Sequence, residues 1–272
     1  MDRICRMLSF SLATLGLGFI AAIPAHAQET ASSSSATLQA HATPQVRPST
    51  VAPLSPVRDA LSRDPWNYGV FFNGGVGIGG DRSDYHFLSA GVRLGKVLTD
   101  PVGPSFLKGQ FEYSAELMPW WQGYAPPFER YNLSYVTYPG TPPADPSTQV
   151  PLIQGPYSTG GTYNGVSITP IILRWDLAGG RRVLPFVQGA GGLIWTNHKF
   201  PPVGPLPEPG HQGTSVWSFT PQFGVGFHYF LKPNRSLTFN ANAVHISNAS
   251  LGDANPGINA SVQFQIGYTW WK

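Results

Sequence analysis

The sequence predicts an all-β protein: an eight-stranded antiparallel transmembrane β-barrel preceded by a disordered N-terminal segment. Three observations carry this prediction. Charged residues make up only 11% of the chain, aromatic residues make up 13%, and long stretches alternate apolar with polar side chains. Alternation places successive side chains on opposite faces of a strand. Beyond the N-terminal segment no run of about 18 apolar residues marks a spanning helix, so a membrane protein of this composition is expected to cross with strands.

Residues 1–27 have the pattern of a secretory signal peptide. Two arginines give a basic start, residues 8–23 are apolar, and an Ala-His-Ala cleavage motif follows. The apolar run is short and ends at Pro24, so we favour cleavage before Gln28 over a signal anchor. The only cysteine, Cys5, lies in this segment, and the mature chain is therefore expected to contain no disulfide.

Residues 28–64 are expected to be a disordered periplasmic lead-in. They are rich in Ala, Ser, Thr, Pro and Gln and carry few aromatic residues, so they cannot bury a core. Residues 65–272 are long enough for one β domain, which we expect to be the barrel. The net charge of +3 comes without a basic stripe, and nucleic acid is not an expected partner.

Eight strands are expected within this domain, each bounded by turn-forming residues or a change in alternation. They are predicted over residues 66–78, 85–98, 106–118, 166–177, 183–196, 215–230, 236–248 and 258–271. The alternation is clearest in the sixth, where Trp217, Phe219 and Phe223 share the face opposite Ser218 and Thr220.

Which face of these strands meets solvent depends on the kind of barrel. A membrane barrel turns its apolar face to lipid, whereas a soluble, lipocalin-like barrel turns it inward. We favour the membrane barrel because aromatic residues crowd the strand ends, as interfacial girdles do. The polar face also carries charges that can pair across a narrow lumen, namely Glu112, Glu116, Arg174 and Asp176.

The connections between strands alternate in length, which orients the barrel. Short joins are expected at 99–105, 178–182 and 231–235, and long ones at 119–165 and 197–214. A barrel of the bacterial outer membrane with both termini in the periplasm has its short turns there and its long loops outside. The seventh strand therefore ends at the level of the outer leaflet.

His245, Ser247 and Asn248 stand near the end of this seventh strand. Counting back from His245 in steps of two gives Ala243 and Ala241, so the imidazole and the hydroxyl extend the apolar, lipid-facing file. Serine becomes a nucleophile when a base takes its proton, and two positions on one strand face are about 6.5–7 Å apart. Asn248 and the turn after it could hold an oxyanion. The pattern predicts a serine esterase that acts on a membrane lipid.

Other motifs give no further chemistry. The glycine-rich run at 74–80 lacks the helix and the acidic partner of a nucleotide site, so it indicates close strand packing. The remaining histidines, such as His86 and His228, are scattered without metal-ligand spacing. We expect neither a metal nor any other cofactor.

The segment Val244-His-Ile-Ser-Asn-Ala-Ser-Leu-Gly-Asp-Ala-Asn-Pro-Gly-Ile-Asn-Ala260 resembles the C-terminal signature of the lipid A 3-O-deacylases, the PagL-type outer-membrane esterases. A looser resemblance covers most of the chain from about residue 66, including Phe111-Glu-Tyr113 and Arg174-Trp175. It implies an eight-stranded barrel that removes the ester-linked acyl chain at position 3 of lipid A, the lipopolysaccharide anchor of the outer leaflet. Ser247 would be the nucleophile and His245 the base, with Asn248 near the oxyanion.

Two positions depart from the family pattern. Where the family has a glutamate as third catalytic residue, this chain has Asn259, whose amide can orient an imidazole but cannot stabilise its charged form. Strict alternation also points Asn259 inward, so a bulge near Gly257 would be needed, and Asp253 is the one acid in the loop that could substitute. Ser250, the second oxyanion candidate, stands where the family commonly has glycine.

A second hypothesis is a non-enzymatic outer-membrane barrel with a structural or adhesive role. The long join at 119–165 would carry that role, and the histidine and serine would be a relic. The replacement of the family's glutamate by Asn259 favours this alternative. Whether the barrel is a monomer or a dimer is left open by the sequence.

Overall fold

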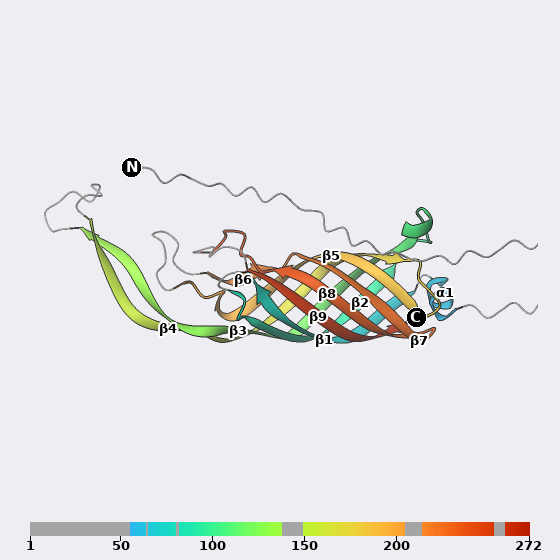
Figure 1. Ribbon diagram of the computed structural model, residues 1–272, viewed down its shortest axis with the longest axis horizontal. Coiled ribbons are helices and arrows are strands. Elements are labelled where there is room, and N and C mark those ends of the chain that lie inside the picture. The colour runs from blue at the N-terminus through green and yellow to red at the C-terminus, as the bar shows by residue number, and fades with distance from the viewer. Residues whose placement is uncertain (1–54, 64, 80–81, 138–148, 205–213, 253–258) are drawn as a thin grey trace, which may run out of the picture. The chain divides into compact units, whose positions relative to one another are not determined.

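The computed structural model describes residues 55–63, 65–79, 82–137, 149–204, 214–252 and 259–272, all of which belong to one compact unit (Figure 1). The predicted signal peptide 1–27 and most of the predicted lead-in 28–64 lie outside the described residues. No helix in the described ranges is both long enough and apolar enough to cross a membrane.

Antiparallel strands dominate the described residues and close on themselves. Their bounds are β1 Trp66–Ile78, β2 His86–Val97, β3 Gly109–Thr137, β4 Gln149–Leu177, β5 Val183–Phe200, β6 Ser215–Phe219, β7 Gln222–Lys232, β8 Arg235–His245 and β9 Ala260–Trp271. Neighbours pair in the order β4-β3-β2-β1-β9-β8-β7-β5, and the β4–β5 pairing closes the ring. β6 continues β7 beyond a break and also pairs with β5, so the described strands form eight barrel positions. The predicted eight-stranded antiparallel barrel is confirmed.

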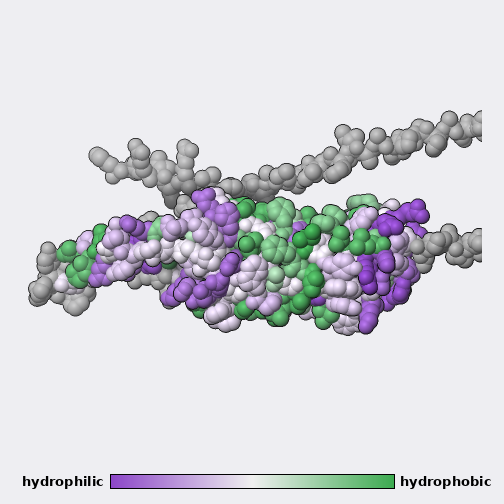
Figure 2. Space-filling view, turned by 90° about the horizontal axis from the view of Figure 1, so that it is seen from below, coloured by the Kyte–Doolittle hydropathy of each residue, from purple (hydrophilic) through white to green (hydrophobic). Residues whose placement is uncertain are grey.

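The barrel has two different ends. At the turn end, short connections join β4 to β5 and β7 to β8, and Trp66 and Trp271 lie in adjacent strands. At the loop end, β1, β5 and β8 finish. β1, β7, β8 and β9 are 11 to 13 residues long, about what a tilted strand needs to cross a bilayer. Figure 2 shows apolar side chains gathered around the middle of the barrel and hydrophilic ones toward both ends.

The alternation sorts side chains as predicted, with apolar groups outside and polar groups in the lumen. On β1, Val70 and Phe72 are exposed while Asn67 and Asn73 are buried. The charged residues of the predicted inner file, Glu112, Glu116, Arg174 and Asp176, are all buried. Arg174 Nη1 lies 3.5 Å from Glu112 Oε1, and Arg93 Nη2 lies 2.6 Å from Glu116 Oε1. Each of these arginines thus has a nearby carboxylate inside the lumen.

At the loop end the inner face becomes apolar, which the sequence analysis did not predict. Side chains from β2 to β5 and β8 meet there in an aromatic plug, made of Tyr85, Phe87, Trp121, Ala125, Tyr163, Ile194, Phe200, Val244 and Ile246. Trp121 and Tyr163 both contact the ring of Phe200 edge-on, with centroids 5.7 and 5.1 Å away. The plug lies on the inner face of the barrel wall at the end of β8, where Val244 and Ile246 belong to it.

The segment 119–165 was predicted as a loop, but most of it is a β-ribbon. β3 and β4 pair with each other from Gly109–Leu177 out to Thr137–Gln149 and project beyond the other strands (Figure 1). β2 pairs with β3 only as far as Tyr124, so the outer part of the ribbon belongs to β3 and β4 alone. Both of its faces are largely exposed and several bulges break its register, so it shows little alternation. Residues 138–148 lie outside the described ones.

The lead-in was predicted to be disordered as far as residue 64, but its end forms helix α1, Pro56–Leu61. Ser55 caps the helix by accepting a hydrogen bond from the Arg58 N–H, and proline occupies the first turn, where its missing N–H costs nothing. Six residues are too few to show helical periodicity. The buried Val57 and Ala60 pack on an apolar cluster of the turn end, made of Val97, Leu184, Phe230 and Trp271.

The predicted sixth strand, 215–230, is interrupted between β6 and β7 at Thr220 and Pro221. Proline has no N–H to donate to a ladder, so a break there has a local cause. The break is used by the neighbouring strand, because the carbonyl of Pro221 accepts a hydrogen bond of 3.0 Å from the His245 N–H. The interruption therefore lies beside the candidate site.

Candidate active site on the outer wall

The end of β8 holds His245 and Ser247 on the outside of the barrel. Ser247 pairs with Phe219 of β6 through two backbone hydrogen bonds of 2.6 and 3.0 Å, so extended pairing continues past the last residue of β8. Val244 and Ile246 alternate with the pair and are buried in the aromatic plug. His245 and Ser247 are half-buried and continue the outward file of β8, as the alternation predicted.

The hydroxyl of Ser247 and the ring of His245 are not hydrogen-bonded to each other. Ser247 Oγ instead accepts a hydrogen bond of 3.1 Å from the Ala249 N–H. No group among the described residues hydrogen-bonds the His245 ring. In enzymes without substrate such catalytic bonds are often long or unformed, and they tighten when the substrate binds. The two side chains share one face of one strand, so rotation about their χ1 angles decides whether they meet.

A tight turn follows Ser247 and fixes Asn248 and Ser250. Ala249 and Ser250 have φ angles of 50° and 62°, a left-handed conformation that disfavours side chains. Asn248 is buried, and its Oδ1 accepts a hydrogen bond of 3.0 Å from the Ser250 N–H. The two predicted oxyanion residues therefore bond to each other. The Ser250 N–H is engaged by this bond.

Gly252 closes the turn, and its lack of a side chain leaves room for Asn248. A Cβ at this position would lie 2.6 Å from Asn248 Nδ2 and 3.2 Å from the carbonyl oxygen of Thr214. Any larger residue would therefore move the Asn248 amide or the segment that contains Thr214. The sequence analysis placed Gly252 in the turn but could not assign it this role, because the packing partner is distant in sequence.

Asn259 lies on the opposite face of the sheet from His245. It is only 7% exposed and continues the inner file of β9, which includes Ser261 and Gln263. The partner of His245 on β9 is Ala260. Asn259 nevertheless contacts the site through its backbone, because its carbonyl accepts a hydrogen bond of 2.8 Å from the N–H of Ile246. Asp253 and Gly257, named above as a substitute acid and a bulge position, lie outside the described residues.

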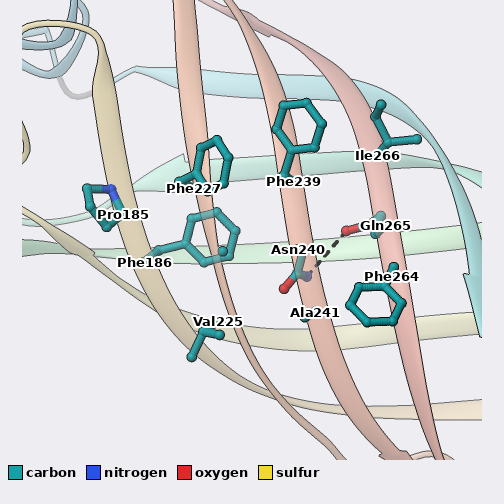
Figure 3. A pocket seen from close by; sticks show the side chains of 11 residues that line it. Pro185, Phe186, Val225, Phe227, Phe239, Asn240, Ala241, Phe264, Gln265 and Ile266 are labelled. Atoms are coloured by element: carbon teal, nitrogen blue, oxygen red, sulfur yellow. Dashed lines mark hydrogen bonds between the residues drawn. The ribbon is translucent and has the colours of Figure 1, made fainter. Parts of the chain in front are cut away.

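An apolar groove, which the sequence analysis did not predict, lies on the outer wall over Ala241, nearer the turn end than His245. The outward side chains that follow His245 on β8 are the small Ala243 and Ala241, and then Phe239. Large neighbours flank these alanines: Ala243 pairs with Phe223 of β7, and Ala241 pairs with Phe264 of β9. A pocket of about 580 Å³ opens over Ala241, with apolar side chains of β5, β7, β8 and β9 around it (Figure 3).

The described residues contain no group of three His, Cys, Asp or Glu side chains that could hold a metal ion. The groups that the described residues place at the outer wall are an imidazole, an alcohol, an amide and backbone N–H groups. These groups are the components of an acyl-transfer site. The apolar groove over Ala241 lies on the same outer wall, which suits an ester whose acyl chain is long.

The fold defines a class, that of the eight-stranded membrane-type β-barrels, and this barrel carries an imidazole and an alcohol on its outer wall. A family model described as "Lipid A 3-O-deacylase (PagL)" matches residues 108–269, which include strands β3 to β8, most of β9 and every candidate site residue. The chain belongs to this family of outer-membrane lipid A deacylases.

Solved structures of other outer-membrane barrels are similar to this chain. The outer membrane enzyme PagL is 16% identical, with a TM-score of 0.36, and the match covers 73% of this chain and 97% of that one. Neisserial surface protein A is 11% identical, with a TM-score of 0.42 and coverages of 75% and 96%. OprG from Pseudomonas aeruginosa is 9% identical, with a TM-score of 0.35 and coverages of 77% and 96%. No curated protein matches the chain significantly.

Proposed function

We propose that this protein is a serine esterase that removes the ester-linked acyl chain at position 3 of lipid A. Membership of the deacylase family supports the reaction class and the lipid substrate. The observation that carries the finer assignment is the placement of His245 and Ser247 together on the outer wall, at the loop end of β8. A lipid-facing wall has no structural use for an imidazole and an alcohol.

The substrate would approach from the side, within the membrane. With the loop end outside the cell, Ser247 lies near the level at which the sugar of lipid A joins its acyl chains. The chain to be removed would run past Ala243 and into the groove over Ala241, between Phe223 and Phe264. These two phenylalanines are 62% and 63% exposed, so an acyl chain can cover their rings.

The reaction would proceed in two acyl transfers. His245 takes the proton from Ser247 Oγ as that oxygen attacks the ester carbonyl. The tetrahedral intermediate collapses, the acyl–oxygen bond to the sugar breaks, and the imidazolium returns the proton to the leaving sugar hydroxyl. Water, deprotonated by His245, then attacks the acyl-serine, which releases a fatty acid and restores the serine hydroxyl. No cofactor is required.

The oxyanion would be held by donors of the turn after Ser247. The Ala249 N–H already points at Ser247 Oγ, and it can turn to the developing oxyanion when that oxygen becomes acylated. The amide Nδ2 of Asn248 is the second donor. In this proposal Ser250 acts indirectly, because its N–H holds Asn248 Oδ1 and so fixes which way the amide faces.

Asn259 would act as a positioning residue rather than as a catalytic acid. Its carbonyl holds the N–H of Ile246, the residue between the base and the nucleophile. This backbone contact is independent of the side chain, so it survives the replacement of the family's glutamate. An imidazolium without a carboxylate partner is less stabilised. In serine proteases, replacing the triad's aspartate by an amide costs about 10⁴ in rate, so we expect this enzyme to be slow.

Mass spectrometry of lipid A tests the proposal. The full chain is expressed in an outer membrane whose lipid A carries the 3-O-linked acyl chain, and loss of that chain is expected with the wild type. Ser247→Ala should retain it. Ser261→Ala, which changes a buried serine of the neighbouring strand, serves as a matched control and should behave as the wild type. Identical acyl patterns for the wild type and Ser247→Ala would refute hydrolysis by Ser247.

The alternative of a non-enzymatic barrel also has specific observations in its favour. Ser247 and His245 do not hydrogen-bond, Asn259 replaces the acid, and the β3–β4 ribbon offers an exposed surface for contacts. Labelling by a serine-directed phosphonate probe in detergent separates the two. Labelling of Ser247 that is lost in His245→Ala supports the esterase, whereas absence of labelling in the wild type supports the alternative.

A further inference from the structure

A second cavity lies at the loop end, apart from the groove on the outer wall. It has a volume of about 280 Å³ and lies between the base of the β3–β4 ribbon and the end of β5. Its lining contains Arg130 of β3 and the adjacent His198 and Lys199 of β5. Ser158 and Thr159 of β4 also line it, and the side chain of Thr159 hydrogen-bonds Tyr163. The cavity thus combines nitrogen and hydroxyl donors from three strands.

The arrangement of these donors fits an anion with several oxygens. The Nε of Arg130 is buried and has no hydrogen-bond partner among the described residues, which is costly for a charged group. A guanidinium presents a planar fork that matches phosphate or carboxylate oxygens, and a lysine adds a point charge. Glu129, the neighbouring acid on β3, is exposed and does not line the cavity.

Lysine and arginine residues are scarce at the loop end of the barrel, and two of them line this one cavity. Among the described residues the loop end carries three lysines and arginines, namely Arg82, Arg130 and Lys199. Arg82 donates a hydrogen bond of 2.7 Å to the hydroxyl of Tyr85 and lies over its ring. Arg130 and Lys199 line the cavity, and Lys199 also has a contact of its own. By contrast, the turn end is ringed by basic residues, among them Lys96, Lys108, Arg182, Lys232 and Arg235.

The cavity shares a wall with the candidate active site. Thr214 lines it, and the carbonyl oxygen of Thr214 packs against Gly252, which closes the turn after Ser247. The next residue, Ser215, begins β6 and pairs with Phe200 of β5, one residue beyond Lys199. Thr214 would therefore lie between an anion bound in the cavity and the turn that carries Asn248.

We propose that this cavity binds a phosphate group on the sugar of the lipid substrate. The proposal rests on the proposed function, because a phosphorylated glucosamine lipid is the substrate that brings a phosphate close to an acyl ester. Arg130 contributes the fork, Lys199 the second charge, and His198 and the hydroxyls the remaining donors. The phosphate contact positions the sugar over Ser247 and takes no part in the chemical step. It makes the site selective for phosphorylated lipid.

Binding to a variant that cannot turn over its substrate tests the phosphate contact directly. Full-length barrel carrying Ser247→Ala is placed in detergent micelles, and its affinity is measured for bisphosphorylated lipid A and for the same lipid after phosphatase treatment. Adding Arg130→Gln and Lys199→Gln should weaken binding of the phosphorylated lipid about tenfold or more, the loss expected for charge-assisted hydrogen bonds. Binding of the dephosphorylated lipid should not change. Lys232→Gln, at the turn end, is the matched control for charge and should have no effect.

Inorganic phosphate separates the lipid headgroup from a free anion. Millimolar inorganic phosphate is expected to compete with the phosphorylated lipid and not with the dephosphorylated one. Its own affinity for the cavity should be much weaker than that of the phosphorylated lipid. Equal losses for both lipids, no loss for either, or a site that binds inorganic phosphate but ignores the lipid's phosphates would overturn the proposal. Retained binding of dephosphorylated lipid shows that the variant is folded. If the wild type fails to deacylate while the phosphate dependence holds, the esterase is refuted and the anion site stands.

Discussion

Two histidines of this barrel lie in different surroundings, one in the lumen and one on the outer wall. His228 is fully buried in the lumen, where its Nε2 accepts from Arg174 at 2.8 Å and its Nδ1 lies 2.9 Å from the hydroxyl of Thr238. The indole of Trp271 packs edge-on against its ring at 5.0 Å. His245, on the outer wall, has no hydrogen bond to its ring among the described residues and lies beside Ser247.

The difference in hydrogen bonding suggests a structural role for His228 and a functional role for His245. Both ring nitrogens of His228 are engaged by luminal partners, so neither is available to take a proton from a substrate. A polar group that faces lipid without partners is costly, and it is retained where a substrate supplies the partner. Substitutions at the two positions should therefore separate activity from stability.

The largest expected effect is on catalysis. His245→Ala should lower the rate of lipid A deacylation by about 10⁴-fold, the loss typical of a base that activates a serine, with little change in unfolding. His228→Ala should do the reverse, because it removes one hydrogen-bond partner each from the buried Arg174 and Thr238. Mass spectrometry of lipid A and urea unfolding followed by tryptophan fluorescence give the two readouts. Activity of the His245→Ala barrel would contradict a catalytic role for His245.

The next largest effect concerns the lumen charges. Arg174→Met leaves Glu112 buried without its cation, and breaking such a pair costs about 3–5 kcal/mol of unfolding free energy. Adding Glu112→Leu should restore much of this loss, because it removes the uncompensated charge. Urea unfolding in detergent measures both. If the single variant is as stable as the wild type, the lumen network does not depend on this pair.

A smaller effect is expected at the turn that follows Ser247. Gly252→Ala places a methyl group against Asn248 Nδ2, and a displaced oxyanion donor should lower kcat about 10²-fold while KM changes little. Gly204, whose Cβ would meet nothing within 4 Å, offers the matched control as Gly204→Ala. Equal rates for the two variants would show that the Asn248 amide does not hold the oxyanion.

The smallest effect is at Ser250, whose φ of 62° is unfavourable for a residue with a side chain. Ser250→Gly should stabilise the barrel by up to about 1 kcal/mol, because glycine adopts left-handed backbone without the cost of a Cβ. Activity should be preserved, since the backbone N–H that holds Asn248 remains. Unfolding in detergent measures the gain, and a destabilised Ser250→Gly barrel would mean that the serine hydroxyl contributes to the turn.

Alternation predicted the barrel well wherever a strand has lipid on one face and the lumen on the other. The bounds of β1 agree with the predicted 66–78, and β2 and β9 differ by one or two residues. The prediction failed for the β3–β4 ribbon, because a ribbon with two exposed faces has no reason to alternate. It also failed for α1, whose stability comes from Val57 and Ala60 packing on strands distant in sequence.

At the candidate site, parity predicted the outward face of His245 and Ser247 and the inward face of Asn259. It could not predict what the side chains contact. The bond between Asn248 and Ser250 depends on the left-handed backbone of Ala249 and Ser250. Neither residue is a glycine, so the sequence does not mark this conformation. The anion cavity likewise joins Arg130 to Lys199 only because the ribbon begins beside β5. Such contacts arise from three-dimensional packing rather than from a periodic pattern.

The filled interior of the barrel has a consequence for how the protein meets its substrate. Below the aromatic plug, two cavities inside the described barrel measure about 20 and 10 Å³, which is too small for an acyl chain. In the proposed function, lipid A reaches Ser247 on the outer wall by lateral diffusion within one leaflet. The rate would then follow the mole fraction of substrate among its neighbouring lipids rather than any bulk concentration, and a tightly packed leaflet would slow turnover without any change in the protein.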